Sequence, residues 1–157
     1  MPGPANGDAW QVMRTSRNSN WGDPELVKME ERVAEKTHKL AGGPGILVGD
    51  LSQPRGGPML TGHESHQVGL DADLWLTPMP ARVLAREERE DMSATMVVDA
   101  SRKAVDPAVW TPGDVVRINA AAEGPEVERI FDNASIKQDL CRQQGTVDRK
   151  GRQQGQT

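Results

Sequence analysis

Residues 23–50, DPELVKMEERVAEKTHKLAGGPGILVGD, determine the fold class of this chain. Asp23 is a favourable helix cap, and Pro24 suits the first helical position, where its missing N–H is not needed. Apolar residues then recur at steps of three and four until two glycines interrupt them, so the sequence predicts an amphipathic helix over residues 24–41. The apolar run at residues 45–50, GILVGD, lies between glycines and predicts a buried strand.

The segment after this strand changes from a loop to a second strand. Residues 52–65, SQPRGGPMLTGHES, are too rich in Gly and Pro for regular structure, so we predict a loop there. Apolar and polar residues then alternate, which predicts a strand over residues 70–76 with one apolar face. The opposite face carries Asp71, Asp73 and Trp75.

The C-terminal half contains further helical and strand signals. Residues 85–92, AREEREDM, are highly charged and predict a solvated helix or loop. A threonine followed by a proline repeats the cap signal and predicts a helix over residues 112–123. Residues 127–131 favour a strand, and residues 134–142 favour a short helix. Because helices and strands follow one another in irregular order, the predicted fold class is α+β.

Length and composition favour one domain with unstructured ends. A chain of 157 residues is typical of a single domain, and a hydrophobic fraction of 36% indicates that part of the chain does not pack. The first residues are rich in Pro and Gly, and the tail ends in DRKGRQQGQT, without an apolar residue. We therefore predict disorder at residues 1–9 and 143–157, around a domain at residues 10–142.

Charge and hydropathy argue against two classes of partner. Lys and Arg number 19 against 23 Asp and Glu, and no basic stripe with interleaved aromatic residues is present, so nucleic acid is not expected as a partner. No apolar run approaches the roughly 20 residues that span a bilayer. The start, MPGPANGDAW, lacks the basic and apolar regions of a secretory signal peptide. The single Cys141 cannot form an internal disulfide.

Residues 62–75, GHESHQVGLDADLW, gather groups that bind metal ions. His63, His66, Asp71 and Asp73 supply the imidazole and carboxylate atoms that zinc prefers. On an unbroken strand His66 and Asp73 would point to opposite faces, but a glycine between them often marks a bend that redirects a side chain. The alternative is a polar turn whose histidines bond the backbone. Trp75 shares the face of Asp73, where it either packs in the core or lines a site.

The stretch at residues 54–75, PRGGPMLTGHESHQVGLDADLW, resembles the signature of the penicillin-insensitive murein endopeptidases. These belong to the wider group of lysostaphin-like and D-Ala-D-Ala metallopeptidases. Other segments resemble the family in the family's order: QVMRTSRNSNWGDPELV, GILVGDLSQPRGG, VDPAVWTP and PEVERIFDNASIKQDLC. The resemblance extends over residues 10–149.

The resemblance implies a fold, an activity and a set of site residues. The implied fold is a small antiparallel sheet flanked by helices. The implied activity is that of a periplasmic zinc peptidase that cleaves D-alanyl-diaminopimelyl cross-links in peptidoglycan. By position, His66 and Asp73 match zinc ligands, and His63 matches a further histidine of the metal site. Arg55, in the loop before the site, is a candidate to pair with a substrate carboxylate.

The sequence departs from the family after His66. The family places a third zinc-binding histidine and a catalytic histidine in a His-x-His pair beyond LCRQQGTVDR, whereas no histidine follows His66 here. We therefore expect a C-terminally truncated and impaired peptidase, with a non-catalytic peptidoglycan-binding module as the alternative. The resemblance also implies that the disulfide partner of Cys141 would lie beyond the end of this chain. The oligomeric state is not predicted.

Overall fold

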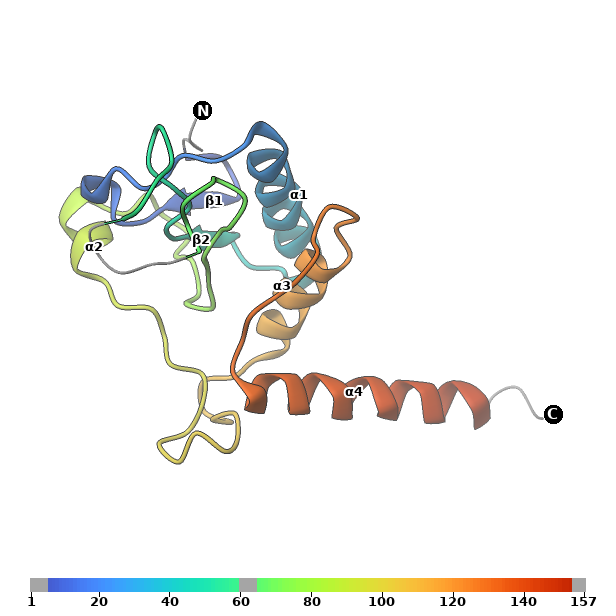
Figure 1. The fold of residues 1–157 in the computed structure, drawn as a ribbon. Coiled ribbons are helices and arrows are strands. Elements are labelled where there is room, and N and C mark those ends of the chain that lie inside the picture. The colour runs from blue at the N-terminus through green and yellow to red at the C-terminus, as the bar shows by residue number, and fades with distance from the viewer. Residues whose placement is uncertain (1–5, 60–64, 154–157) are drawn as a thin grey trace.

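A sheet of three short strands lies between helices in the computed structural model of the chain (Figure 1). The structure describes residues 6–59 and 65–153. Its elements, in chain order, are β1 (Trp10–Val12), the short 3-10 helix η1 (Thr15–Arg17), α1 (Pro24–Ala41), β2 (Ile46–Val48), β3 (Leu74–Trp75), α2 (Arg86–Asp91), α3 (Pro112–Ala122) and α4 (Ala134–Gln153). The predicted α+β class is confirmed.

The sheet is mixed, with the strand order β1-β2-β3. Strand β2 pairs in parallel with β1 and antiparallel with β3. The expected antiparallel sheet is therefore only partly right. The chain passes from β1 to β2 through α1, and a helical crossover of this kind returns the chain in a parallel direction. Strand β1 was not predicted, because three residues are too few to show an alternating pattern.

Helix α1 has the bounds that the sequence predicts. The Asp23 carboxylate accepts a hydrogen bond from the Glu25 N–H at 2.9 Å, which satisfies one of the free amides of the first turn. At the other end the Gly42 N–H donates to the His38 carbonyl. The cap, the proline and the terminal glycine are all local signals, which explains why this helix could be placed from sequence.

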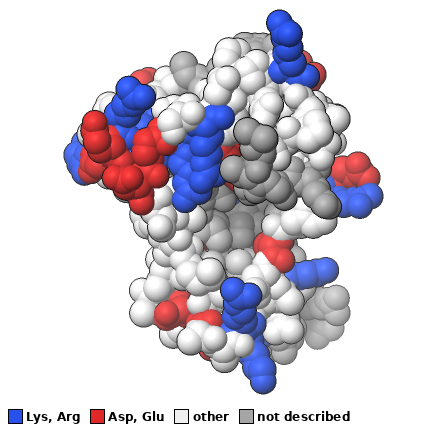
Figure 2. Space-filling model, turned by 60° about the vertical axis from the view of Figure 1, so that its left-hand side comes forward, with Lys and Arg blue, Asp and Glu red and all other residues white. Residues whose placement is uncertain are grey.

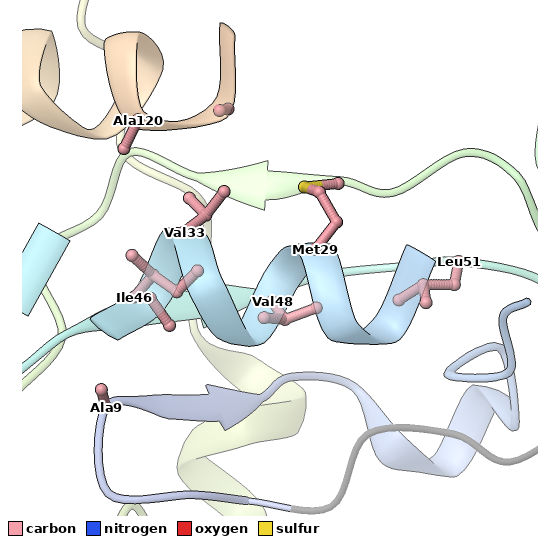
Figure 3. Packing of buried hydrophobic residues seen from close by; sticks show 9 residues of the cluster. Ala9, Met29, Val33, Ile46, Val48, Leu51 and Ala120 are labelled. Atoms are coloured by element: carbon pink, nitrogen blue, oxygen red, sulfur yellow. The ribbon is translucent and has the colours of Figure 1, made fainter. Parts of the chain in front are cut away.

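Two apolar clusters cover the two faces of the sheet. On one face α1 packs against β2 and α3 packs against α1, and Met29, Val33 and Ala120 belong to one cluster with Ile46 and Val48 (Figure 3). On the other face lies a second cluster of Met13, Leu47, Trp75, Met79 and Leu84. All three residues of β2 are fully buried, as expected for a central strand between two layers.

The strand predicted at residues 70–76 is shorter in the structure. Only Leu74 and Trp75 pair with β2, and Leu70 is 66% exposed. The backbone at Gly69 has a φ of 73°, a left-handed conformation that turns the chain just before this segment. Trp75 is 8% exposed and packs in the second cluster, so the prediction of a single apolar face is wrong at this position.

Two predictions in the C-terminal half are corrected. Residues 127–131 form no strand, because Ile130 and Phe131 are exposed and no neighbouring described strand pairs with them. The helix predicted at residues 134–142 continues as α4 to Gln153. Gln, Arg and Lys favour helix, no proline interrupts the segment, and the Gln143 amide donates to Asp139 one turn earlier at 2.6 Å.

The described part of the N-terminal segment is attached to the domain. The Asn6 side-chain oxygen accepts hydrogen bonds from the Val12 N–H at 3.1 Å and from the Arg89 guanidinium at 2.7 Å. Residues 6–9 were assigned to an unstructured segment by sequence, and the domain boundary at residue 10 stays a prediction.

None of the described helices is both long and apolar enough to cross a membrane. Figure 2 shows acidic and basic side chains lying next to one another on one face.

Candidate functional site

The candidate site lies where β2 ends and β3 begins. The Gly49 N–H donates to the Asp73 carbonyl at 2.7 Å, and the Asp73 N–H donates to the Asp50 carbonyl at 3.0 Å. These two hydrogen bonds fix the backbone of Asp73 against the C-terminal end of the central strand. Asp73 is therefore positioned by the most deeply buried element of the fold.

His66 faces Asp73 across this site. Its Nε2 atom lies 3.3 Å from the Asp73 Oδ1 atom, which brings together the two residues that the resemblance assigns as zinc ligands. The His66 side chain is 4% exposed, whereas that of Asp73 is 47% exposed. The bend at Gly69 that the sequence indicated is present between them. The pair thus combines a fixed imidazole with a carboxylate that faces solvent.

The spacing of this pair fits two ligands of one zinc ion. Zinc binds imidazole nitrogen and carboxylate oxygen at about 2.0–2.2 Å with tetrahedral geometry, which places neighbouring ligand atoms about 3.4 Å apart. A charge-assisted hydrogen bond between the same groups is usually shorter, at about 2.7–2.9 Å. The observed 3.3 Å agrees with the first value. His66 and Asp73 are therefore suitable zinc ligands by both atom type and separation.

The other predicted site residues are His63 and Arg55, of which the structure describes Arg55. His63 lies outside the described residues, and the described ranges contain no group of three or more His, Cys, Asp or Glu arranged to hold a metal. Arg55 is exposed on the loop after β2. That loop is tied to the segment of His66, because the Gly57 N–H donates to the Gln67 carbonyl at 2.7 Å. The role of Arg55 stays a prediction.

A second carboxylate, Asp50, anchors the end of β2. It is buried, forms an ion pair with the Arg17 guanidinium at 2.8 Å and accepts a hydrogen bond from the Ser19 hydroxyl. The Ser19 carbonyl in turn accepts from the Leu51 N–H at 2.7 Å. This network joins η1 and the segment after it to the end of β2, where the Asp50 carbonyl accepts from the Asp73 N–H. These residues were not predicted as site residues, because no local motif marks them.

The absence of a side chain at Gly49 leaves room for Asp73 and Trp75. A Cβ atom added at Gly49 would lie 2.6 Å from the Trp75 Nε1 atom and 3.0 Å from the Asp73 Cβ atom. Both distances are shorter than ordinary van der Waals contact, so a side chain at this position must shift Trp75 and press against Asp73. The site therefore depends on the glycine that directly follows the central strand, a requirement that the sequence alone does not show.

We expect Gly49→Ala to destabilise the fold and to displace Asp73. Crowding in a packed region costs about 1 to 3 kcal/mol, which urea denaturation will show as a lower midpoint. Gly43→Ala is the matched control, because a Cβ there meets no atom within 4 Å. Equal midpoints for the two variants would contradict the close packing at Gly49.

Trp75 and Arg14 complete this side of the site. The Arg14 guanidinium carbon lies 5.2 Å from the centre of the Trp75 ring, within the range of a cation–π interaction. Of the two roles considered for Trp75, packing is supported by its burial in the second apolar cluster. Its ring also forms a platform for the arginine, next to the strand position of Asp73.

Comparisons with known proteins agree with the sequence pattern. A family model described as penicillin-insensitive murein endopeptidase matches residues 2–152. The penicillin-insensitive murein endopeptidase of Haemophilus influenzae is 42% identical over 142 residues, which is 90% of this chain and 49% of that protein. The proteins of the same name from Yersinia enterocolitica and Klebsiella pneumoniae are 38% and 37% identical, with 50% and 52% of their lengths covered.

The chain thus spans about half the length of the curated relatives it matches. Within that half, the match includes the strand end, the Gly-rich loop and the His66–Asp73 pair described above. The match of the family model over nearly all of the chain shows that it belongs to the penicillin-insensitive murein endopeptidase family.

Proposed function

We propose that this chain carries part of a zinc-dependent peptidase site that acts on D-alanyl-diaminopimelyl cross-links of peptidoglycan, in the periplasm. The observation that supports the zinc site is the separation of 3.3 Å between His66 Nε2 and Asp73 Oδ1. His63 is proposed as a further ligand from the same motif. Membership of the murein endopeptidase family supports the substrate class.

Three described residues, His66, Asp73 and Arg55, would contribute to such a site. A bound zinc ion would supply an acidified water molecule and polarise the scissile carbonyl group. Burial of His66 fixes the imidazole plane, and the solvent-facing Asp73 leaves its carboxylate accessible. The exposed Arg55, on the loop tied to His66, is proposed to pair with a substrate carboxylate through its planar fork.

Zinc titration by calorimetry at neutral pH tests the ligand assignment. We expect Asp73→Ala to weaken zinc binding at least 100-fold, because even changes outside the ligand shell commonly cost about 10- to 100-fold. Asp71→Ala is the matched control, since it removes a carboxylate two residues away on the same segment. Equal affinities for the two variants, with both chains folded, would remove Asp73 from the site.

Incubation with insoluble murein separates the proposed peptidase from the alternative of a non-catalytic binding module. Release of soluble muropeptides that depends on zinc and on Asp73 is the result expected of a peptidase. Sedimentation of the chain with murein, without any release, would instead assign it to binding alone. Absence of both results would contradict peptidoglycan as the target.

A further inference from the structure

Arg14 is half-buried and lies at the edge of the candidate site. It follows Met13, whose N–H donates to the Val48 carbonyl at 2.8 Å and so extends β1 along β2. This register brings Arg14 level with the end of β2, where Gly49 contacts Asp73. The side chain then extends over the Trp75 ring, 5.2 Å away.

The charge of Arg14 is not matched by an acidic group in the described part of the chain. Arg17 pairs with Asp50 at 2.8 Å, and Arg117 pairs with Asp114 at 2.9 Å, but no ion pair involves Arg14 among residues 6–59 and 65–153. Its Nε atom is buried and has no hydrogen-bond partner there. A buried N–H without an acceptor is unfavourable, so the described part of the fold does not satisfy this guanidinium group.

The backbone of Arg14 adopts a conformation that is unfavourable for a residue with a side chain. Its φ of 50° is in the left-handed region, which is unfavourable for a residue other than glycine. Two hydrogen bonds maintain this conformation. The Arg14 N–H donates to the Arg89 carbonyl at 3.1 Å, and the Arg14 carbonyl accepts from the Arg17 N–H at 3.0 Å. Strained conformations that are fixed in this way concentrate at ligand sites.

We propose that Arg14 binds a carboxylate of the peptide substrate beside the His66–Asp73 pair, and so contributes to substrate specificity. Its guanidinium presents several N–H donors in a plane, which matches the two oxygens of a carboxylate, and its central carbon lies 5.2 Å from the centre of the Trp75 ring. The diaminopimelyl cross-link offers such carboxylates. This inference rests on the proposed function, because it assigns a role in recognising the same substrate.

Calorimetric binding of two ligands tests this role, with zinc present and the full chain used throughout. The first ligand is a cross-linked muropeptide dimer with free carboxylates, and the second is the same dimer with its carboxylates amidated. We expect Arg14→Gln to weaken binding of the free dimer about 10- to 100-fold, since a charge-assisted bidentate contact is lost. Arg14→Lys keeps the charge without the planar fork and should give a smaller loss.

The controls distinguish carboxylate recognition from a structural role. Arg86→Gln removes the same charge from an exposed site on α2 and should leave binding unchanged. Zinc affinity should be equal in the wild type and all three variants. If the Arg14→Gln variant binds the free dimer as tightly as the wild type does, or if it loses affinity equally for both dimers, Arg14 does not recognise the carboxylate. If the wild type binds neither dimer, the proposed function fails, and this inference fails with it.

Discussion

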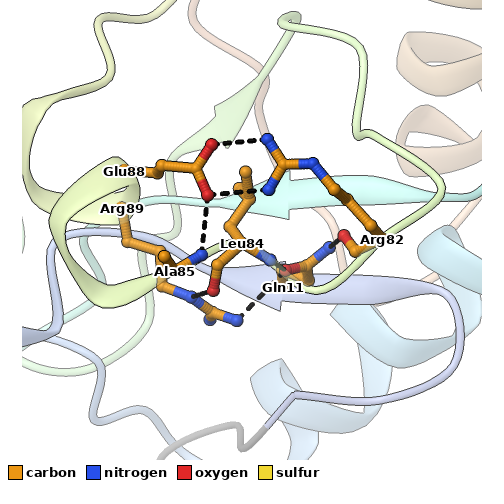
Figure 4. A network of polar contacts seen from close by, with 6 residues as sticks. All are labelled: Gln11, Arg82, Leu84, Ala85, Glu88 and Arg89. Carbon is orange, nitrogen blue, oxygen red and sulfur yellow. Dashed lines mark hydrogen bonds and ion pairs between the residues drawn. The ribbon is translucent and has the colours of Figure 1, made fainter.

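Replacing Arg89 with methionine should lower the free energy of unfolding by about 3 to 5 kcal/mol, because the side chain is buried and several buried acceptors lose their donor. The guanidinium donates to four oxygens that belong to Asn6, Gln11, Val12 and Leu84, at distances of 2.7 to 3.1 Å. These contacts join α2 to β1 and to the N-terminal segment, and Figure 4 shows those with Gln11 and Leu84. Guanidinium chloride denaturation followed by circular dichroism measures the effect.

Arg82 provides the control for this prediction, because it lies in the same network but on the surface. Its guanidinium forms two hydrogen bonds with the Glu88 carboxylate, and these bonds lower the pKa of Glu88 to about 2. Exposed ion pairs contribute little to stability, so Arg82→Met should leave the denaturation midpoint almost unchanged. A similar midpoint for both variants would show that the Arg89 contacts do not stabilise the fold. Arg89→Lys should give an intermediate loss.

The sequence predicted those parts of the fold that have local signals. Helix α1 has a cap, a proline and a terminal glycine, and all three contribute in the structure as expected. The apolar run at residues 45–50 contains β2, whereas β1 was too short to be predicted, and residues 127–131 show the opposite error. Their apolar side chains match a strand pattern, but a strand forms only where a partner edge is available. The length of α4 was underestimated because polar composition was taken as disorder.

The candidate site was predictable to the extent that it lies in one motif. His66 and Asp73 are close in sequence, and the structure brings them together through the bend at Gly69. Gly49 and Arg14 lie just after β2 and β1, so their contacts with Asp73 and Trp75 depend on strand pairing rather than on sequence spacing. Nothing in the local sequence distinguishes such residues from an ordinary strand glycine or a surface arginine.

Glu30→Gln should raise the free energy of unfolding by about 3 to 5 kcal/mol at pH 9 and change it little at pH 4. Glu30 lies in α1, is 2% exposed, and neither of its carboxylate oxygens has a hydrogen-bond partner among the described residues. Burial disfavours the ionised form and raises the pKa of Glu30 from 4.5 to about 8, with a smaller contribution from Glu31. The native chain therefore holds this carboxyl group in its neutral form at pH 7.

The direction of the pH dependence follows from this raised pKa. Between pH 4.5 and about 8 the native state retains a proton that the unfolded state has lost, so stability decreases as pH rises through this window and levels off above it. Glutamine has a similar shape and no charge, so denaturant titrations of Glu30→Gln from pH 4 to pH 9 should show a flatter profile. Glu35→Gln is the control, because Glu35 lies on the same helix in an exposed ion pair with Lys39. Parallel profiles for the wild type and Glu30→Gln would mean that the carboxylate is ionised in the native state at neutral pH and that the α1 interface accommodates its charge.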